Sequence, residues 1–304
     1  MSQTNFSSFS SEVVERFKVL QDDICAGLED LDGQGKFQED LWERPGGGGG
    51  RTRVIEGTHI EKGGVNFSAV YGSMPEVVAK ELNLPSNRFI ATGVSIVLHA
   101  KNPYVPIIHM NVRYFETDKG HWWFGGGIDV TPIIVFPNDA RDFHIQMKEV
   151  CDRYSDTAYA EYKKWADDYF FIKHRNETRG VGGIFFDRLT GKNDSDQADL
   201  WKFVVEVGES FVPAYSQLFT GHYQDEYGHD EEEWQMIRRG RYVEFNLVYD
   251  RGTKFGLQTS GRIESILMSL PPQARWKYDY ARNHKPFEME TLSYLKKDID
   301  WVNL

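Results

Sequence analysis

The chain is short of cysteine, of positive charge and of long apolar runs, and each shortage argues against a class of protein. Its 304 residues include two cysteines, too few for a disulfide framework and typical of a reducing compartment. The 35 Lys and Arg stand against 46 Asp and Glu, and the resulting net charge of −11 argues against a general nucleic-acid binder. No run of about 18 uncharged apolar residues is present, so a membrane-spanning helix is excluded.

The N-terminal stretch MSQTNFSSFSSEVVERF also lacks the marks of a targeting sequence. It has neither a basic segment followed by an apolar one nor an Arg-rich transit pattern, so we expect a cytoplasmic protein. Hydrophobic residues make up 40% and aromatic residues 14% of the chain, which is typical of a globular protein with a sizeable core.

The hydrophobic pattern predicts the α+β class, as one domain over residues 1–304, with a large antiparallel sheet flanked by helices on both faces. Apolar residues recur at helical spacing after Ser10 or Ser11, which places an N-terminal helix and its lead-in within 1–35. Period-two patterning then predicts strands in meander order, because the connections are too short for helical crossovers. These strands are expected at 51–60, 65–71, 88–99, 106–116 and 122–136.

The remaining segments are expected to be mainly helical, with Asn138 capping a helix that runs to about Tyr154. Further helices are expected at 157–172, 195–219, 263–269 and 287–299, and a strand pair at 241–249 and 254–259. The five glycines Gly46–Gly50 predict a flexible loop, which is either a plain connection or a lid over a ligand. They are not a P-loop, because no Gly-Lys-Ser/Thr follows.

Segment 93–116 is expected to carry the chemistry on one face of a strand pair. Alternation places polar side chains on one face and apolar ones on the other. The polar side chains are those of Ser95, His99, His109, Asn111 and Arg113. A hairpin centred on residue 104 would pair His99 with His109 and Ser95 with Arg113. The planar guanidinium of Arg113 suits a carboxylate, so this face is either solvated or binds an acidic small molecule.

Segment 238–262 is the second candidate, because it has six cations and two acids in an acidic chain. Asp250 is expected at the end of a strand, where it would be a general base, an acceptor for a substrate N–H, or a turn residue. Ser260, Gly261 and Arg262 open the next predicted helix, where they would hold a carboxylate or, in the case of Ser260, cap the helix.

Four long motifs resemble the oxygen-dependent coproporphyrinogen III oxidases, from about residue 36 to the C-terminus. They are VSIVLHAKNPYVPIIHMNVRYF, WWFGGGIDVTP, YKKWADDYFFIKHRNETRGVGGIFFD and RRGRYVEFNLVYDRGTKFGLQTSGRIESILMSLPP. The resemblance implies oxidative decarboxylation of two propionates of coproporphyrinogen III to vinyl groups, which yields protoporphyrinogen IX for haem synthesis. It implies molecular oxygen as co-substrate, no organic cofactor, and a homodimer that forms through about 242–277.

The resemblance also assigns residues by position. Substrate-binding positions match Ser95, Asn111, Val112, Arg113, Ser260, Gly261 and Arg262. The proton donor matches His109, and an aspartate that contacts pyrrole N–H groups matches Asp250. Divalent-metal ligands of bacterial members match His99, His109, His144 and His174, although none of these has a common metal-ligand spacing. Ser260 departs from the glycine expected in many bacterial members. A metal-dependent oxygenase with a four-His site and a non-catalytic tetrapyrrole carrier are the alternatives.

Overall fold

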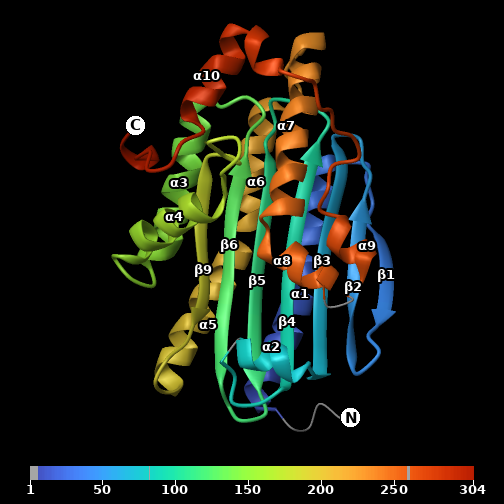
Figure 1. The fold of residues 1–304 in the computed structure, drawn as a ribbon, viewed down its shortest axis with the longest axis vertical. Helices are drawn as coiled ribbons and strands as arrows, with labels where there is room; N and C mark the ends of the chain where they lie inside the picture. The colour runs from blue at the N-terminus through green and yellow to red at the C-terminus, as the bar shows by residue number, and fades with distance from the viewer. Residues whose placement is uncertain (1–5, 82, 259–260) are drawn as a thin grey trace.

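The structure is a computed structural model that describes residues 6–81, 83–258 and 261–304. A seven-stranded antiparallel sheet, in the order β1-β2-β3-β4-β5-β6-β9, forms its centre (Figure 1). The strands are β1 (Gln38–Glu43), β2 (Gly48–Ile55), β3 (Ile60–Ser73), β4 (Arg88–Ala100), β5 (Ile107–Thr117), β6 (Trp122–Thr131) and β9 (Gly182–Leu189). The meander order is therefore confirmed, and the edge strands β1 and β9 are additions that the periodicity did not predict. A separate two-stranded sheet pairs β7 (Phe171–Ile172) with β8 (Glu177–Thr178).

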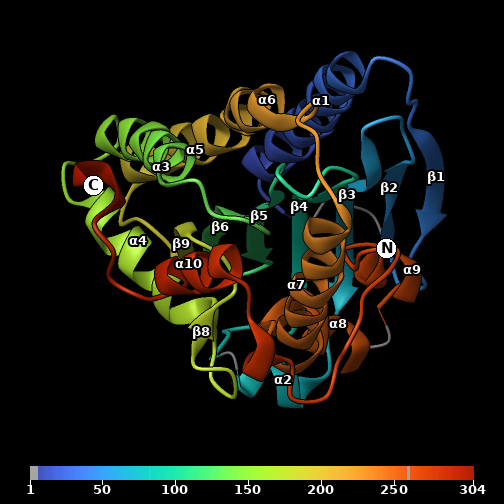
Figure 2. The same cartoon turned by 90° about the horizontal axis from the view of Figure 1, so that it is seen from above.

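Helices cover both faces of the sheet, which confirms the α+β class (Figure 2). One face is covered by α1 (Ser8–Asp32), α3 (Pro137–Asp152), α5 (Asp194–Glu209) and α6 (Phe211–His222). The other is covered by α7 (His229–Val248), α8 (Arg251–Gln258) and α9 (Ile263–Leu267). The remaining helices are α2 (Glu76–Glu81), α4 (Ala158–Tyr169), α10 (Pro286–Tyr294), and the 3-10 turns Tyr280–Asn283 and Trp301–Asn303. None of the described helices is both long and apolar enough to cross a membrane.

The main core lies between α1 and the apolar face of the sheet. Helix α1 begins after Ser7, whose side chain accepts a hydrogen bond from the Ser10 backbone N–H. Its apolar stripe is fully or almost fully buried, and alternate residues of β4 and β5 meet it from the sheet. The buried residues are Val13, Phe17, Leu20, Ile24 and Leu28 of the helix and Val94, Ile96, Leu98, Ile108, Met110 and Val112 of the strands.

The predicted strand pair 241–249 and 254–259 is wrong, because this part of the chain is helical. Residues 241–248 belong to α7 and residues 251–258 to α8, and Thr259 lies outside the described residues. Val243, Phe245 and Leu247 imitate a strand by alternating with polar residues. Burial instead follows helical spacing at Trp234, Arg238, Tyr242 and Phe245, so packing against the sheet decides the structure.

The predicted flexible loop is also wrong for Gly48–Gly50, which lie in β2 and pair with β1 and β3. A Cβ on Gly50 would lie 2.2 Å from the Trp42 ring, so the missing side chain makes room for that indole. The chain therefore uses these glycines for close packing rather than for flexibility.

Three element boundaries differ from the prediction. Asn138 lies inside α3 rather than at its cap, since the N-cap residue is Phe136 and has no capping side-chain hydrogen bond. The predicted helix 195–219 is two helices that meet at Ser210. The last helix ends at Tyr294 instead of near residue 299.

Candidate active site

The predicted polar face of β4 and β5 exists, but its register differs by two residues. Ser95 pairs with Asn111, and Val97 pairs with His109, so His99 does not oppose His109 and Ser95 does not oppose Arg113. A shift of two residues leaves every side chain on its predicted face. The polar groups are thus gathered on the side of the sheet that α7, α8 and α9 cover (Figure 2). Val112 points to the opposite, buried face, so only its backbone is available to a ligand there.

Arg113 lies on β5 with its side chain 36% exposed. Its guanidinium donates to the Asn111 side-chain oxygen at 2.7 Å and to Asp187 of β9 at 2.8 Å. A Cβ on Gly125 of β6 would lie 2.7 Å from both guanidinium nitrogens Nε and Nη2, so this glycine makes space for the ion pair. A half-exposed guanidinium that is already oriented by two partners can bind an incoming carboxylate.

His109 begins a chain of side-chain contacts that runs into the protein through Asp129 to Arg179. Its Nδ1 lies 2.8 Å from Asp129 of β6, and the second carboxylate oxygen of Asp129 accepts from Arg179 at 2.6 Å. Asp129 and Arg179 are both 2% exposed at the side chain. Burial alone would raise the pKa of Asp129, but the Arg179 charge and the His109 contact lower it. Asp129 therefore stays ionised and fixes the imidazole, while no described residue hydrogen-bonds its Nε2.

Arg179 is held by aromatic rings as well as by its ion pair. Its guanidinium carbon lies 4.3 Å from the centroid of Phe170, 4.8 Å from Tyr242 and 4.7 Å from Phe245. Two of these rings come from α7, so the helix that covers the sheet also encloses the charge. This arrangement encloses the positive charge of Arg179 behind Asp129.

Asp250 lies at the junction of α7 and α8, not at the end of a strand as predicted. One carboxylate oxygen accepts from the Thr253 backbone N–H at 2.7 Å, in the manner of a helix cap. The other accepts from the Tyr169 hydroxyl at 2.9 Å. Asp250 is thus both a local turn residue and a carboxylate that an aromatic side chain orients.

Arg262 lies over the other end of the sheet. It forms an ion pair with Asp40 of β1 and donates to Ser265 at 2.9 Å and to Thr52 of β2 at 3.3 Å. Strands lie about 4.8 Å apart, so β1 and β2 are on the order of 14–19 Å from β5, which carries Arg113. Gly261 donates its N–H to the Gly256 carbonyl at 2.8 Å. Ser260 lies outside the described residues, and the N-cap residue of α9 is Arg262.

The four predicted metal-binding histidines do not come together. His99 is buried with Nε2 2.9 Å from the Ser269 carbonyl, and burial lowers its pKa to about 3. His144 is buried in α3 between the Tyr159 hydroxyl and the Val181 carbonyl. His174 is exposed and meets Glu244 at 2.8 Å. In the described ranges, no group of three His, Cys, Asp or Glu side chains could hold a metal ion.

Four residues of this site were missed by the sequence reasoning: Asp129, Arg179, Asp187 and Tyr169. Asp129 could have been found, because strand alternation in GGGIDVTP places it on the same face as Gly125 and Gly127, on the strand that follows His109. Arg179 and Tyr169 gave no such signal, since their partners lie 50 and 81 residues away along the chain.

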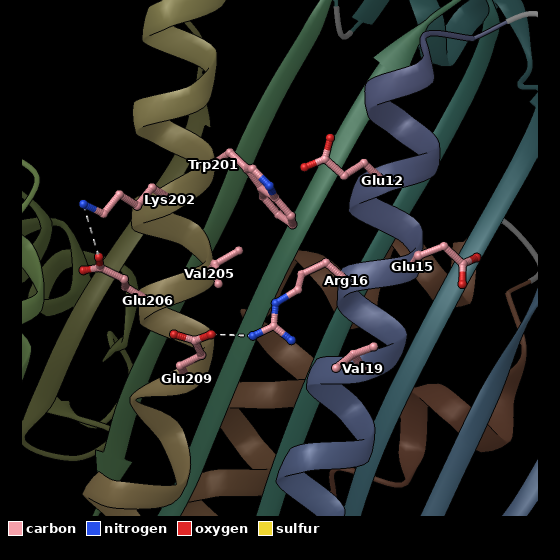
Figure 3. Close-up of a pocket in the computed structure, with 9 residues that line it drawn as sticks. All are labelled: Glu12, Glu15, Arg16, Val19, Trp201, Lys202, Val205, Glu206 and Glu209. Atoms are coloured by element: carbon pink, nitrogen blue, oxygen red, sulfur yellow. Dashed lines mark hydrogen bonds and ion pairs between the residues drawn. The ribbon is translucent and has the colours of Figure 1, made fainter.

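A surface groove between α1 and α5 lies on the opposite side of the sheet (Figure 3). It is lined by Trp201, Val19 and Val205 among charged side chains, and an ion pair between Arg16 and Glu209 crosses it. None of the predicted site residues lines this groove. The polar face under α7, α8 and α9 therefore remains the candidate active site.

Comparison with known proteins agrees with these motifs. A family model described as coproporphyrinogen III oxidase matches residues 12–301. The chain is 50% identical to coproporphyrinogen-III oxidase 1, chloroplastic, of Arabidopsis thaliana, over 97% of this chain and 81% of that protein. It is 49% identical to an oxygen-dependent coproporphyrinogen-III oxidase, chloroplastic, of Glycine max, over 96% and 80%. A Prochlorococcus marinus oxygen-dependent coproporphyrinogen-III oxidase is 46% identical, over 93% and 88%.

Proposed function

Because the chain belongs to the coproporphyrinogen III oxidase family, we propose that it converts coproporphyrinogen III to protoporphyrinogen IX with molecular oxygen. Two propionates become vinyl groups, a step of haem biosynthesis. Each propionate loses its carboxylate as carbon dioxide and one hydrogen from the β-carbon, the methylene attached to the ring, as the vinyl double bond forms. Two electrons pass to oxygen, which becomes hydrogen peroxide with the C–H proton and one further proton.

One observation from the site carries this proposal most directly. We assign one carboxylate each to Arg113 of β5 and to Arg262, which contacts β1 and β2, strands that lie on the order of 14–19 Å from β5. That separation is too large for a small acid and suits a large substrate with several carboxylates. Ser95 and Asn111, the backbone of Val112 and the segment Ser260–Gly261 would complete substrate binding.

The chemistry needs a proton source and a group that activates the ring. We assign the further proton to His109, whose Nε2 faces away from its Asp129 contact. Asp250 would polarise or remove a pyrrole N–H proton. The ring then becomes more electron-rich and more readily oxidised. The substrate supplies the electrons, and the protein supplies orientation and proton transfer.

These roles are tested by substitution of Asp250, the proposed base, and of Arg262, which is proposed to bind a carboxylate. Asp250→Ala is expected to lose most turnover while it keeps substrate affinity, and Arg262→Ala is expected mainly to raise KM. Unchanged turnover in pure Asp250→Ala enzyme would contradict the base role. An unchanged KM in Arg262→Ala would remove that arginine from substrate binding.

We further propose that the reaction needs neither an organic cofactor nor a bound metal. The separation of His99, His109, His144 and His174 supports this over a four-His oxygenase. The test is oxygen uptake with coproporphyrinogen III in the presence of a chelator, with the porphyrin products separated after oxidation. Product that appears only after iron or manganese is restored would favour the metal-dependent alternative, and tight binding without oxygen uptake would favour a carrier.

The assembly is proposed from the family resemblance, and the location from the two cysteines, a number typical of a reducing compartment. We propose a homodimer that forms through residues 242–277, and a cytoplasmic location. Sedimentation velocity of the pure protein tests the first, with a monomer at micromolar concentration as the contrary result. Cell fractionation tests the second.

A further inference from the structure

We propose that Tyr169 is a positioning residue that holds the Asp250 carboxylate in the orientation its reaction requires. This inference rests on the proposed function, in which Asp250 accepts the pyrrole N–H. The Tyr169 hydroxyl donates to Asp250 at 2.9 Å and accepts from the Arg251 backbone N–H at 3.1 Å. One side chain from α4 thus contacts both residues of the α7–α8 junction.

Asp250 has little other support. It follows the last turn of α7, where Leu247 and Val248 are 45% and 49% exposed. Its backbone N–H donates to the Phe245 carbonyl at 3.0 Å, and among the described residues only the Thr253 N–H, at 2.7 Å, also binds its carboxylate. With the Thr253 contact alone, the carboxylate could turn about its own axis. The Tyr169 hydroxyl fixes the second oxygen and removes that freedom.

Tyr169 is itself well fixed. It is the last residue of α4, and its ring stacks on Phe185 of β9 with centroids 4.2 Å apart and an interplanar angle of 12°. Phe170 meets the same ring edge-on at 5.0 Å. Burial and the Asp250 charge raise the pKa of Tyr169, so the hydroxyl stays neutral and remains a donor. Tyr169 therefore ties the orientation of Asp250 to the sheet through Phe185, in addition to its ring contact with Phe245 of α7.

Tyr169 could affect the reaction either by positioning the Asp250 carboxylate or by lowering its basicity. The two explanations predict opposite changes in turnover when the Tyr169 hydroxyl is removed. A hydrogen bond from Tyr169 stabilises the carboxylate and makes it a weaker base, so its loss would speed a reaction limited by basicity. If orientation dominates, its loss slows the reaction, because small displacements of a reacting group are costly in rate. Removal of one hydroxyl therefore separates the two explanations by sign.

Tyr169→Phe tests the proposal, since it removes the hydroxyl and keeps the stacked ring. We expect kcat to fall about 10-fold while KM stays within about twofold. Tyr280→Phe is the matched control, because its hydroxyl also donates to a carboxylate, that of Glu288 at 2.8 Å, away from the site. The control is expected to keep wild-type kcat and KM.

The double variant Tyr169→Phe/Asp250→Ala identifies the route of the effect. If Tyr169 acts through Asp250, the double variant is no slower than Asp250→Ala alone. Wild-type or faster turnover in Tyr169→Phe, beside an inactive Asp250→Ala, overturns the positioning role and leaves the base role intact. A kcat loss of equal size in both backgrounds also overturns it, because Tyr169 would then act without Asp250. Active Asp250→Ala enzyme would instead overturn the base role itself.

Discussion

The Nδ1 of His109 lies 2.8 Å from a carboxylate oxygen of Asp129, and this contact joins the open face of the sheet to a buried ion pair. Among the described residues, Asp129 is the only ion-pair partner of Arg179. The imidazole therefore donates its Nδ1 proton inward, and Nε2 is the nitrogen available to a substrate. Asp129 therefore has two roles: it orients the His109 imidazole and it neutralises the charge of Arg179.

Asp129→Asn is expected to reduce both turnover and stability. The amide is a poorer acceptor for the His109 N–H, so we expect kcat to fall at least about 10-fold with little change in KM. The buried Arg179 loses its counter-charge, which is expected to cost about 3–5 kcal/mol of unfolding free energy. Steady-state kinetics at low temperature and chemical denaturation measure the two effects.

Asp167→Asn is the control for Asp129→Asn, because Asp167 is another buried carboxylate and pairs with Lys163 at 2.6 Å. It is expected to lose stability while it keeps its kcat. Equal kcat losses in the two variants would mean that destabilisation, not the His109 contact, explains the effect.

The polar face could be predicted from the sequence because its signal is local. Along the segment from Ser95 to Arg113, polar residues alternate with apolar ones. This alternation predicted the correct face for each side chain, even though the strand pairing differs by two residues. The register depends on the turn between β4 and β5, which the pattern does not specify. A slip of one residue would have inverted the face, whereas a slip of two preserves it.

Helix α7 could not be predicted because long-range ion pairs decide its burial. Arg238 pairs with Glu177 and Arg239 with Glu61, 61 and 178 residues away along the chain. Both guanidinium groups are buried. A hydrophobic pattern counts charged residues as solvent-exposed, so it misses this buried face of the helix. The location of Asp250 was therefore also missed, since it depends on where α7 ends.

Gly125→Ala is expected to weaken substrate binding more than stability. The new methyl group would lie 2.7 Å from Arg113 Nε and Nη2 and from the Asp187 carboxylate, so it would displace the end of a flexible side chain rather than the backbone. We expect KM to rise several-fold with a small change in kcat, measured by steady-state kinetics. Gly221→Ala in α6 is the control, because nothing lies within 4 Å of its added methyl group. It should stabilise the protein by up to about 1 kcal/mol without a change in KM.

Asp32→Ala is expected to be strongly destabilising although it is far from the candidate site. The carboxylate at the end of α1 accepts four backbone N–H groups at 2.8 Å, from Gly35, Thr58, His59 and Ile60. Its removal leaves buried donors without partners, each of which costs about 1–3 kcal/mol. We expect a loss of at least about 3 kcal/mol in chemical denaturation, and a loss below about 1 kcal/mol would show that water replaces the carboxylate.

His222 is expected to make part of the protein's stability depend on pH. The imidazole lies 2.7 Å from both Asp139 of α3 and Asp225, and it stacks on Phe136. The Asp139 hydrogen bond raises its pKa, partly opposed by burial and aided by Asp225. A raised folded pKa means that the protonated form is stabilised on folding, so the contribution is complete below the unfolded pKa of about 6.5 and is lost as pH rises through the folded pKa.

The comparison of wild type with His222→Gln over a range of pH measures this contribution. We expect the difference in Tm to be largest near pH 6 and to shrink toward pH 9, as His222 loses its proton in the folded protein. The exposed His121, which has no carboxylate contact among the described residues, supplies the control variant His121→Gln. Its Tm difference should stay constant across the same range. A Tm difference for His222→Gln that is equally large at pH 9 would mean that the neutral imidazole, through its stacking on Phe136, supplies the stability.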